Sequence, residues 1–195
     1  RYPKVFPVRL GEAVMKFLFA CVLGVLLHST VAGAIDPPRS TPLITVFGNV
    51  SQTNRDAFAP ERDLYFKHLG ITFDRAAVFD AEMLAALPQS EIAADFPAGS
   101  ATRRFSGPRL ADLLKAVGAD GSTVTVTAID GYAAEIPMAD VARFNPIFAI
   151  AEEGAPLALG AYGPGFVVFP RLDDPALKGM VDDFWVWGVI AISVR

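Results

Sequence analysis

The segment Phe105-Ser-Gly-Pro-Arg-Leu-Ala-Asp-Leu-Leu-Lys-Ala-Val-Gly118 is the part of this chain around which the rest can be placed. Its apolar residues recur at helical spacing and predict one helix with a single apolar stripe, made of Leu110, Leu113, Leu114 and Val117. Pro108 suits the first helical turn, because its missing N–H would be unpaired there. Gly118 suits the left-handed residue just past the helix.

A pair of strands is predicted directly after this helix, from Ser122-Thr-Val-Thr-Val-Thr-Ala-Ile-Asp-Gly-Tyr132. Val124 to Ile129 alternates valine and alanine with threonine and isoleucine, which is the period of a strand with one buried face. Asp130-Gly131 offers the positive φ angles that a tight two-residue turn requires. The second strand is therefore expected over 132–137.

The remaining pattern predicts short strands and helices in irregular order. We expect strands over 43–48, 73–78, 90–95, 146–151, 166–169 and 184–194, and helices over 61–69, 81–87 and 138–143. The last strand is long and carries Trp185 and Trp187 on one face, because side chains alternate along a strand. With no internal repeat and no linker, residues 35–195 are expected to form a single α+β domain with mixed strands.

The N-terminus has the pattern of a secretory signal peptide. Residues 15–34 start at Met15 with a short charged stretch, continue as an apolar run and end in small residues at Ala34. The run is too short to span a membrane, so cleavage near Ala34 and a periplasmic or secreted location are predicted. Residues 1–14 are interpreted as an upstream over-extension of the gene start; a genuine long pre-region is the alternative.

Removal of the leader changes the chemistry that the chain can perform. The single cysteine, Cys21, leaves with it, which excludes disulfides, cysteine-based zinc sites, iron–sulfur clusters and cysteine nucleophiles from residues 35–195. Four of the 17 basic and one of the 21 acidic residues precede Ile35, which leaves 13 basic and 20 acidic residues and a net charge of −7. An acidic domain without a basic run is a poor nucleic-acid binder.

Five short motifs follow one another along the chain: Phe105-x-Gly-Pro-x-Leu-x-x-Leu-Leu-x-x-x-Gly118, Ala128-x-Asp-Gly-Tyr132, Glu153-Gly-x-Pro-Leu157, Gly163-Pro164 before Val167-Val-Phe-Pro170, and Trp185/Trp187 before Ile192-x-Val194. This ordered set resembles the sulfite-oxidase-type molybdopterin-binding domain, and is most similar to its small secreted members. The resemblance covers about Leu43 to Val194. It implies a compact, mixed, mostly β fold with a few short helices.

The resemblance also implies a cofactor, molybdopterin, whose molybdenum the family's enzymes hold through the dithiolene and one cysteine thiolate. In those enzymes the cysteine lies upstream of the helix, where this chain has residues 90–105 and no cysteine. Two interpretations stay open. One is a ligand-binding or accessory module without the molybdenum thiolate. The other is an active molybdopterin-dependent oxidoreductase with a non-cysteine ligand, for which Ser100, Ser106 or Asp95 offers oxygen.

Three arginines are candidates for an anionic ligand. Arg103 and Arg104 precede the central helix, whose N-terminus at Gly107–Arg109 would assist, and Arg171 follows a buried strand. The alternative for the first two is alternation on an edge strand with one guanidinium in solvent. A small anionic molecule is the ligand that these residues predict.

A carboxylate and aromatic rings complete the candidate site. Asp130 and Tyr132 would stand at a pocket mouth, and Trp185 or Trp187 would form its wall; the alternatives are an ordinary turn and core packing. A protein partner on the tryptophan-bearing strand is a third function class. No metal site is predicted, because Asp173-Asp174 and Asp182-Asp183 lack the oxygen spacing of a calcium loop.

Overall fold

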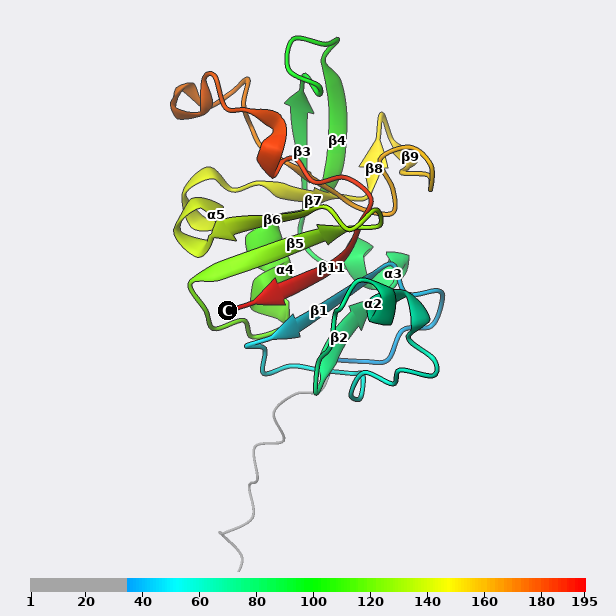
Figure 1. Ribbon diagram of the computed structural model, residues 1–195. Helices are drawn as coiled ribbons and strands as arrows, with labels where there is room; N and C mark the ends of the chain where they lie inside the picture. Colours follow the sequence, from blue (N-terminus) through cyan, green and yellow to red (C-terminus); the bar gives the residue numbers. More distant parts are fainter. Residues whose placement is uncertain (1–34) are drawn as a thin grey trace, which may run out of the picture. The chain divides into compact units, whose positions relative to one another are not determined.

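A five-stranded mixed sheet forms the centre of the computed structural model, which describes residues 35–195 (Figure 1). The predicted signal peptide and upstream extension lie outside the described residues. The strands are β1 (Ile44–Gly48), β2 (Ala76–Phe79), β3 (Gln89–Ala94), β4 (Arg103–Pro108), β5 (Thr123–Ala128), β6 (Ala133–Pro137), β7 (Ile147–Ala149), β8 (Ala151–Glu152), β9 (Ala155–Pro156), β10 (Phe166–Val168) and β11 (Val189–Val194).

The helical elements are short and lie between these strands. They are α2 (Leu64–His68), α3 (Ala81–Ala85), α4 (Leu110–Ala116), α5 (Met138–Phe144) and the 3₁₀ turns η1 (Pro175–Leu177) and η2 (Asp182–Phe184). The predicted α+β fold with mostly β structure is confirmed. None of the helices between Ile35 and Arg195 has the length and apolarity that a bilayer crossing requires.

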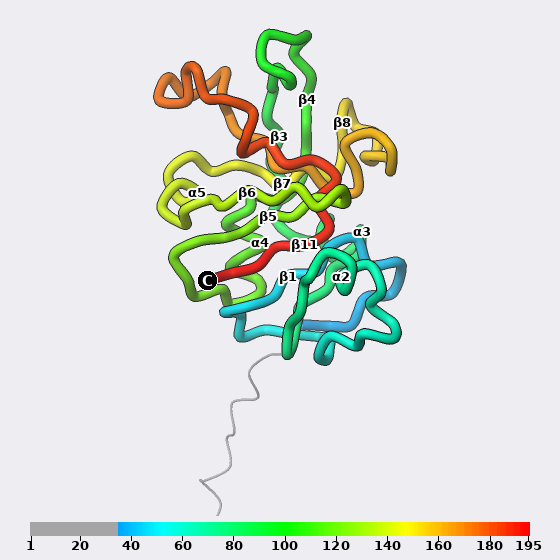
Figure 2. Tube along the Cα trace, in the orientation of Figure 1, coloured from blue at the N-terminus to red at the C-terminus, as the bar shows by residue number. Residues whose placement is uncertain are grey.

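The central sheet has the order β2-β1-β11-β5-β6. Its β1–β11 pair is parallel, with Thr45 opposite Ala191, and the other pairs are antiparallel. Figure 2 shows β1 and β11 running side by side, although they come from opposite ends of the described chain. Two smaller sheets, β3-β4-β8-β9 and β10-β7, complete the fold.

The central helix and the strand after it match the sequence pattern. All four residues of the predicted stripe are buried: Leu110, Leu113, Leu114 and Val117. They pack in one core cluster with Val124 and Val126 of β5. Gly118 has a φ of 58°, as a residue just past a helix requires.

The start of this helix differs from the prediction. Pro108 is the last residue of β4, where it faces Gln89, and Arg109 is still extended with a ψ of 140°. The helix begins only at Leu110, whose N–H donates to the carbonyl of Pro146 at 2.9 Å. The first N–H of the helix is therefore already paired within the chain.

The β5–β6 turn also differs from the prediction. Four residues, 129–132, connect the strands, and only Gly131 has a positive φ, at 87°. The N–H of Gly131 donates to Ala128 at 3.1 Å, and the N–H of Ala128 donates to Tyr132 at 2.8 Å. The longer turn carries Asp130 and Tyr132 away from the sheet as exposed residues.

The predicted long strand over 184–194 is wrong in its first half. β11 starts at Val189, and Gly188 before it has a φ of 65°. Trp185 is 2% exposed and Trp187 is 43% exposed, so the two rings do not share one face of a strand. The reason is a change of pairing partner. Val189 lies opposite Ala128, where β5 ends, whereas Trp187 forms an isolated bridge with Phe166 of β10.

Candidate functional site

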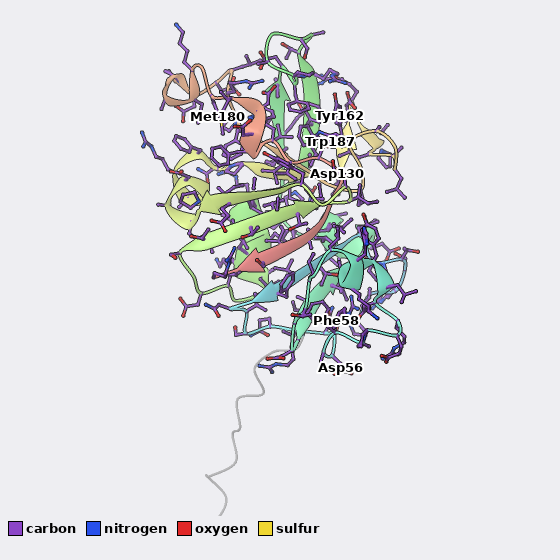
Figure 3. The ribbon with its side chains drawn as sticks, viewed as in Figure 1. Asp56, Phe58, Asp130, Tyr162, Met180 and Trp187 are labelled. Carbon is purple, nitrogen blue, oxygen red and sulfur yellow. The ribbon has the colours of Figure 1, made fainter. Side chains whose placement is uncertain are left out.

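A cavity of about 360 Å³ brings together three separate segments of the chain. These are the β3–β4 connection, the β5–β6 turn and the segment from η2 to Trp187. Figure 3 shows Asp130 and Trp187 close together, near Tyr162 and away from Asp56 and Phe58. The lining residues are Phe96, Ala128, Asp130, Tyr132, Asp182, Asp183, Trp185, Val186 and Trp187.

A larger hollow of about 690 Å³ lies elsewhere, beside Phe47, Phe73 and Arg75. It contains none of the candidate site residues that the sequence predicted, and more of its lining surface is polar than apolar. The smaller cavity is the better candidate, because apolar walls with a few convergent polar groups are typical of ligand sites.

The floor of the cavity is aromatic. Trp185 stacks on Phe96 with ring centroids 5.7 Å apart and an interplanar angle of 12°. Phe166 and Phe169 lie against the same indole at 6.1 and 6.2 Å. The indole Nε1 of Trp185 is buried and has no hydrogen-bond partner among the described residues. The floor is therefore rigid and carries one unsatisfied donor.

Arg171 packs against the Trp185 ring that forms this floor. Its guanidinium carbon lies 4.4 Å from the centre of the Trp185 ring. The guanidinium donates to Asp95 at 3.1 Å, to Asp182 at 2.5 Å and to the carbonyl of Met180 at 3.0 Å. Burial lowers the pKa of Arg171, but the carboxylates of Asp182 and Asp95 outweigh this effect and raise the pKa overall. Arg171 is a permanent cation whose charge is already balanced.

Arg103 is likewise bound within the chain. Its guanidinium donates to Glu152, to the carbonyl of Phe96 and to the hydroxyl of Tyr162, at 2.7, 2.7 and 2.8 Å. The hydrogen bond to Tyr162 and the neighbouring Glu152 raise the pKa of Arg103 despite partial burial. Its hydrogen bond to the carbonyl of Phe96 helps to hold that residue in the cavity wall. All three of these hydrogen bonds go to groups of the chain itself.

Arg104 lies apart from the cavity. Its side chain is 62% exposed and forms an ion pair with Glu153 at 3.0 Å. β4 pairs with β3 on one side and with β8 on the other, so the two arginines do not lie on an edge strand. One guanidinium does point to solvent, as the alternative interpretation expected.

The rim of the cavity combines aromatic rings with carboxylates. The Tyr132 hydroxyl donates to the backbone carbonyl of Asp183 at 2.8 Å and links the β5–β6 turn to η2. The Tyr132 N–H donates to the Asp130 carboxylate at 2.9 Å, which fixes the turn. Trp187 packs edge-on against Tyr162, with ring centroids 6.5 Å apart, and leaves 43% of its surface exposed.

The charge around the cavity is negative. Five carboxylates, those of Asp95, Asp130, Glu152, Asp182 and Asp183, stand against the two guanidiniums of Arg103 and Arg171, which leaves three negative charges. Both guanidiniums already face carboxylates. An anionic ligand, as the sequence predicted, would need an unpaired cation, and residues 35–195 provide none at this cavity.

Part of the predicted site is brought together and part is not. Asp130, Tyr132 and Trp185 line the cavity, and Arg171 and Arg103 lie behind it. Sequence reasoning missed Phe96 as a wall, and it considered Asp182 and Asp183 only as metal ligands, a role that it rejected. The run Asp182-Asp-Phe-Trp-Val-Trp187, in which acidic residues precede two tryptophans, is the signal that was available.

The residues do not fit a molybdenum centre held as the family holds it. Residues 90–105 form β3, β4 and their connection, and they offer no thiolate. Both Asp95 oxygens already accept hydrogen bonds, from Arg171 and from the Gly99 N–H at 2.8 Å. Within residues 35–195, no three His, Cys, Asp or Glu side chains are grouped closely enough to hold a metal ion.

Comparison with known proteins adds evidence on the fold. No family model and no curated protein matches the chain. Among solved structures, it is similar to the crystal structure of the sulfane dehydrogenase SoxCD from Paracoccus pantotrophus, with a TM-score of 0.54 and 16% sequence identity. The match covers 84% of this chain and 40% of that one. It supports a distant sulfite-oxidase-like fold and says nothing about activity.

Proposed function

We propose that this chain is a ligand-binding module, exported to the periplasm or beyond, that uses a sulfite-oxidase-like fold without a molybdenum thiolate. The observation that carries the proposal is the cavity floored by Phe96 and Trp185, at the end of a β3–β4 connection that offers no soft metal ligand. The volume of about 360 Å³ suits a small molecule.

The charged groups behind the cavity are held in their charged forms. Burial raises the pKa of Asp95, but the Gly99 N–H and Arg171 outweigh this effect and lower the pKa overall. The pKa values of Arg103 and Arg171 are raised by their hydrogen-bond partners. In the proposed binding site these three groups therefore serve to fix the cavity walls.

The proposal is tested on the full chain, expressed in a host that makes molybdenum cofactor and exports proteins. Elemental analysis and native mass spectrometry of the purified protein are expected to show no stoichiometric molybdenum. Fluorescence after acid oxidation is expected to show no pterin. Molybdenum and pterin at one equivalent each, together with turnover of an oxo-acceptor with an artificial electron acceptor, would establish the oxidoreductase interpretation instead.

Export is tested in the same preparation. N-terminal sequencing of protein from the periplasmic fraction is expected to begin at or near Ile35, as cleavage after Ala34 predicts. A chain that stays in the cytoplasm with residues 15–34 attached would contradict the proposed location.

A further inference from the structure

We propose that the ligand of this cavity is a compact organic cation, recognised by the exposed rings of Trp187 and Tyr132 and by the carboxylates of Asp130 and Asp183. This inference rests on the proposed ligand-binding function and specifies its chemistry. It departs from the anionic ligand that the arginines of the sequence predict.

The aromatic contribution comes from two rings that the fold leaves open. Tyr132 is 49% exposed and Trp187 is 43% exposed, and both line the same cavity from different segments. A cation over the face of a tryptophan or tyrosine is attracted by the ring quadrupole, and quaternary ammonium groups are the ligands most often recognised in this way. Packing against Tyr162 holds Trp187 at the rim.

The carboxylates provide a charge that the chain does not itself neutralise. Asp182 is paired with Arg171, but within residues 35–195 neither Asp130 nor Asp183 forms an ion pair. Asp130 accepts one backbone N–H, from Tyr132, with one of its two oxygens. The cavity therefore has a negative rim next to aromatic surface, which a positively charged ligand would complement.

The spacing of these carboxylates favours an organic cation over a metal ion. Asp130, Asp182 and Asp183 all line the cavity, yet they are not grouped as a metal-ligand set. A hard cation such as calcium needs six to eight oxygens converging on one point. An ammonium group with carbon substituents instead fills space between rings and carboxylates without close coordination.

Trp185 forms the floor of the same cavity, is 2% exposed, and its indole Nε1 is buried without a hydrogen-bond partner among residues 35–195. Buried polar groups are normally hydrogen-bonded, and an exception calls for an explanation. Because an indole N–H donates, it would pair with an acceptor oxygen carried by the ligand, such as the hydroxyl of choline, and not with the positive charge.

Choline and its uncharged isostere 3,3-dimethylbutan-1-ol test the proposal directly. The two probes share shape and differ in charge. We expect choline to bind the full-length protein, measured by calorimetry and by quenching of tryptophan fluorescence, at least about tenfold more tightly than the isostere. Choline affinity should fall as salt is raised, because the rim carboxylates are exposed. Inorganic phosphate should not compete.

Two variants and two matched controls locate the site. Trp187→Leu and Asp183→Asn should each weaken choline binding about fivefold or more, with unchanged melting temperature. Tyr65→Leu, an equally exposed aromatic on α2, and Asp173→Asn, an exposed carboxylate on the neighbouring loop, should leave binding unchanged. Equal losses in the controls would overturn the assignment to this cavity.

The outcomes separate this inference from the proposed function. If the isostere or phosphate binds as well as choline and Trp187→Leu weakens it, the cavity is a ligand site but the cationic class is wrong. If choline, ethylammonium and guanidinium all fail to bind, the cationic class is also wrong, whatever else the cavity takes. Molybdenum and pterin in the purified protein would overturn the proposed function itself.

Discussion

Arg171 is the residue on which three distant segments meet. Its side chain is 6% exposed, and it joins Asp95 after β3, Asp182 in η2 and the ring of Trp185. A buried ion pair contributes little compared with apolar packing, but removal of one partner leaves an uncompensated charge. Arg171 therefore matters for the geometry of the floor more than for a ligand's charge.

Replacement of Arg171 by alanine is expected to destabilise the domain by about 3–5 kcal/mol, because Asp95 and Asp182 lose their common partner. Arg104→Ala is the control, since its ion pair with Glu153 is exposed and worth about 1 kcal/mol or less. Urea denaturation of both variants measures the difference. Equal losses for the two arginines would show that the burial of Arg171 has no energetic consequence.

Gly107 is a second residue whose identity is fixed by its surroundings. A Cβ at this position would lie 2.1 Å from the carbonyl oxygen of Phe148, in the strand next to it. The Phe148 carbonyl belongs to the backbone and cannot move aside as the end of a flexible side chain can. β4 and β7 would therefore have to separate to admit the new methyl group. We expect Gly107→Ala to cost about 1–3 kcal/mol or more in thermal or urea unfolding. A stability equal to that of the parent protein would contradict this packing.

At the scale of elements, α4 shows that local helix propensity contributes little to the stability of a short helix. It has seven residues, too few to be stable alone in water, so its stability comes from the core it covers. Leu110 and Leu113 are fully buried, as their spacing predicted. The helix is thus specified by its apolar stripe rather than by its ends.

Truncation of this stripe is expected to be costly. Leu113→Ala removes a side chain that is 0% exposed and should lower the free energy of unfolding by about 2–5 kcal/mol. Lys115→Ala, on the exposed face of the same helix, should change it by about 0.5 kcal/mol at most. Denaturant titrations of the pair provide the measurement, and a neutral Leu113→Ala would place the stripe outside the core.

Elements with a strong period were predictable, and elements set by pairing were not. α4 and β5 follow from the spacing of their own residues, and the side chain of Asp80 caps α3 by accepting from the Met83 N–H at 2.9 Å. The extent of β11 depends on where β5 ends, which a sequence pattern cannot show. Pro108 failed as a helix start because pairing with β3 holds it in a strand.

The site was predictable only in pieces. Asp130, Tyr132 and Trp185 were singled out from local features, a turn and an aromatic cluster. That they line one cavity depends on which segments the tertiary fold brings together. The partners of Arg171, Asp95 and Asp182, lie 76 and 11 residues away in the chain. A reader of the sequence who does not know these ion pairs would take the charge of Arg171 to be available to a ligand.

At the scale of the whole molecule, the contact of the β3–β4 connection with the 171–182 segment should depend on pH. Burial raises the pKa of Asp95, but the Gly99 N–H and Arg171 outweigh it and lower the pKa overall. A carboxyl with a depressed folded-state pKa adds stability above its unfolded pKa of about 4, and this stability is lost as the pH falls through the folded value.

The comparison of Asp95→Asn with the parent protein tests this dependence. The variant should melt at a lower temperature at pH 7, and the difference should shrink as the pH falls below about 4, where the parent carboxyl also becomes neutral. Melting curves between pH 7 and pH 3 provide the measurement. A difference that grows toward low pH would reverse the sign and exclude the ion pair as its cause.

The position of β11 between β1 and β5 has a consequence for biosynthesis. During translation the β1–β2 pair and the β5–β6 hairpin are made first, and each has an unpaired edge until β11 is made. Contacts between residues as distant as Thr45 and Ala191 form slowly, and they form only after the intervening polypeptide has been made. The central sheet can therefore close only late in synthesis, which is compatible with the export proposed above.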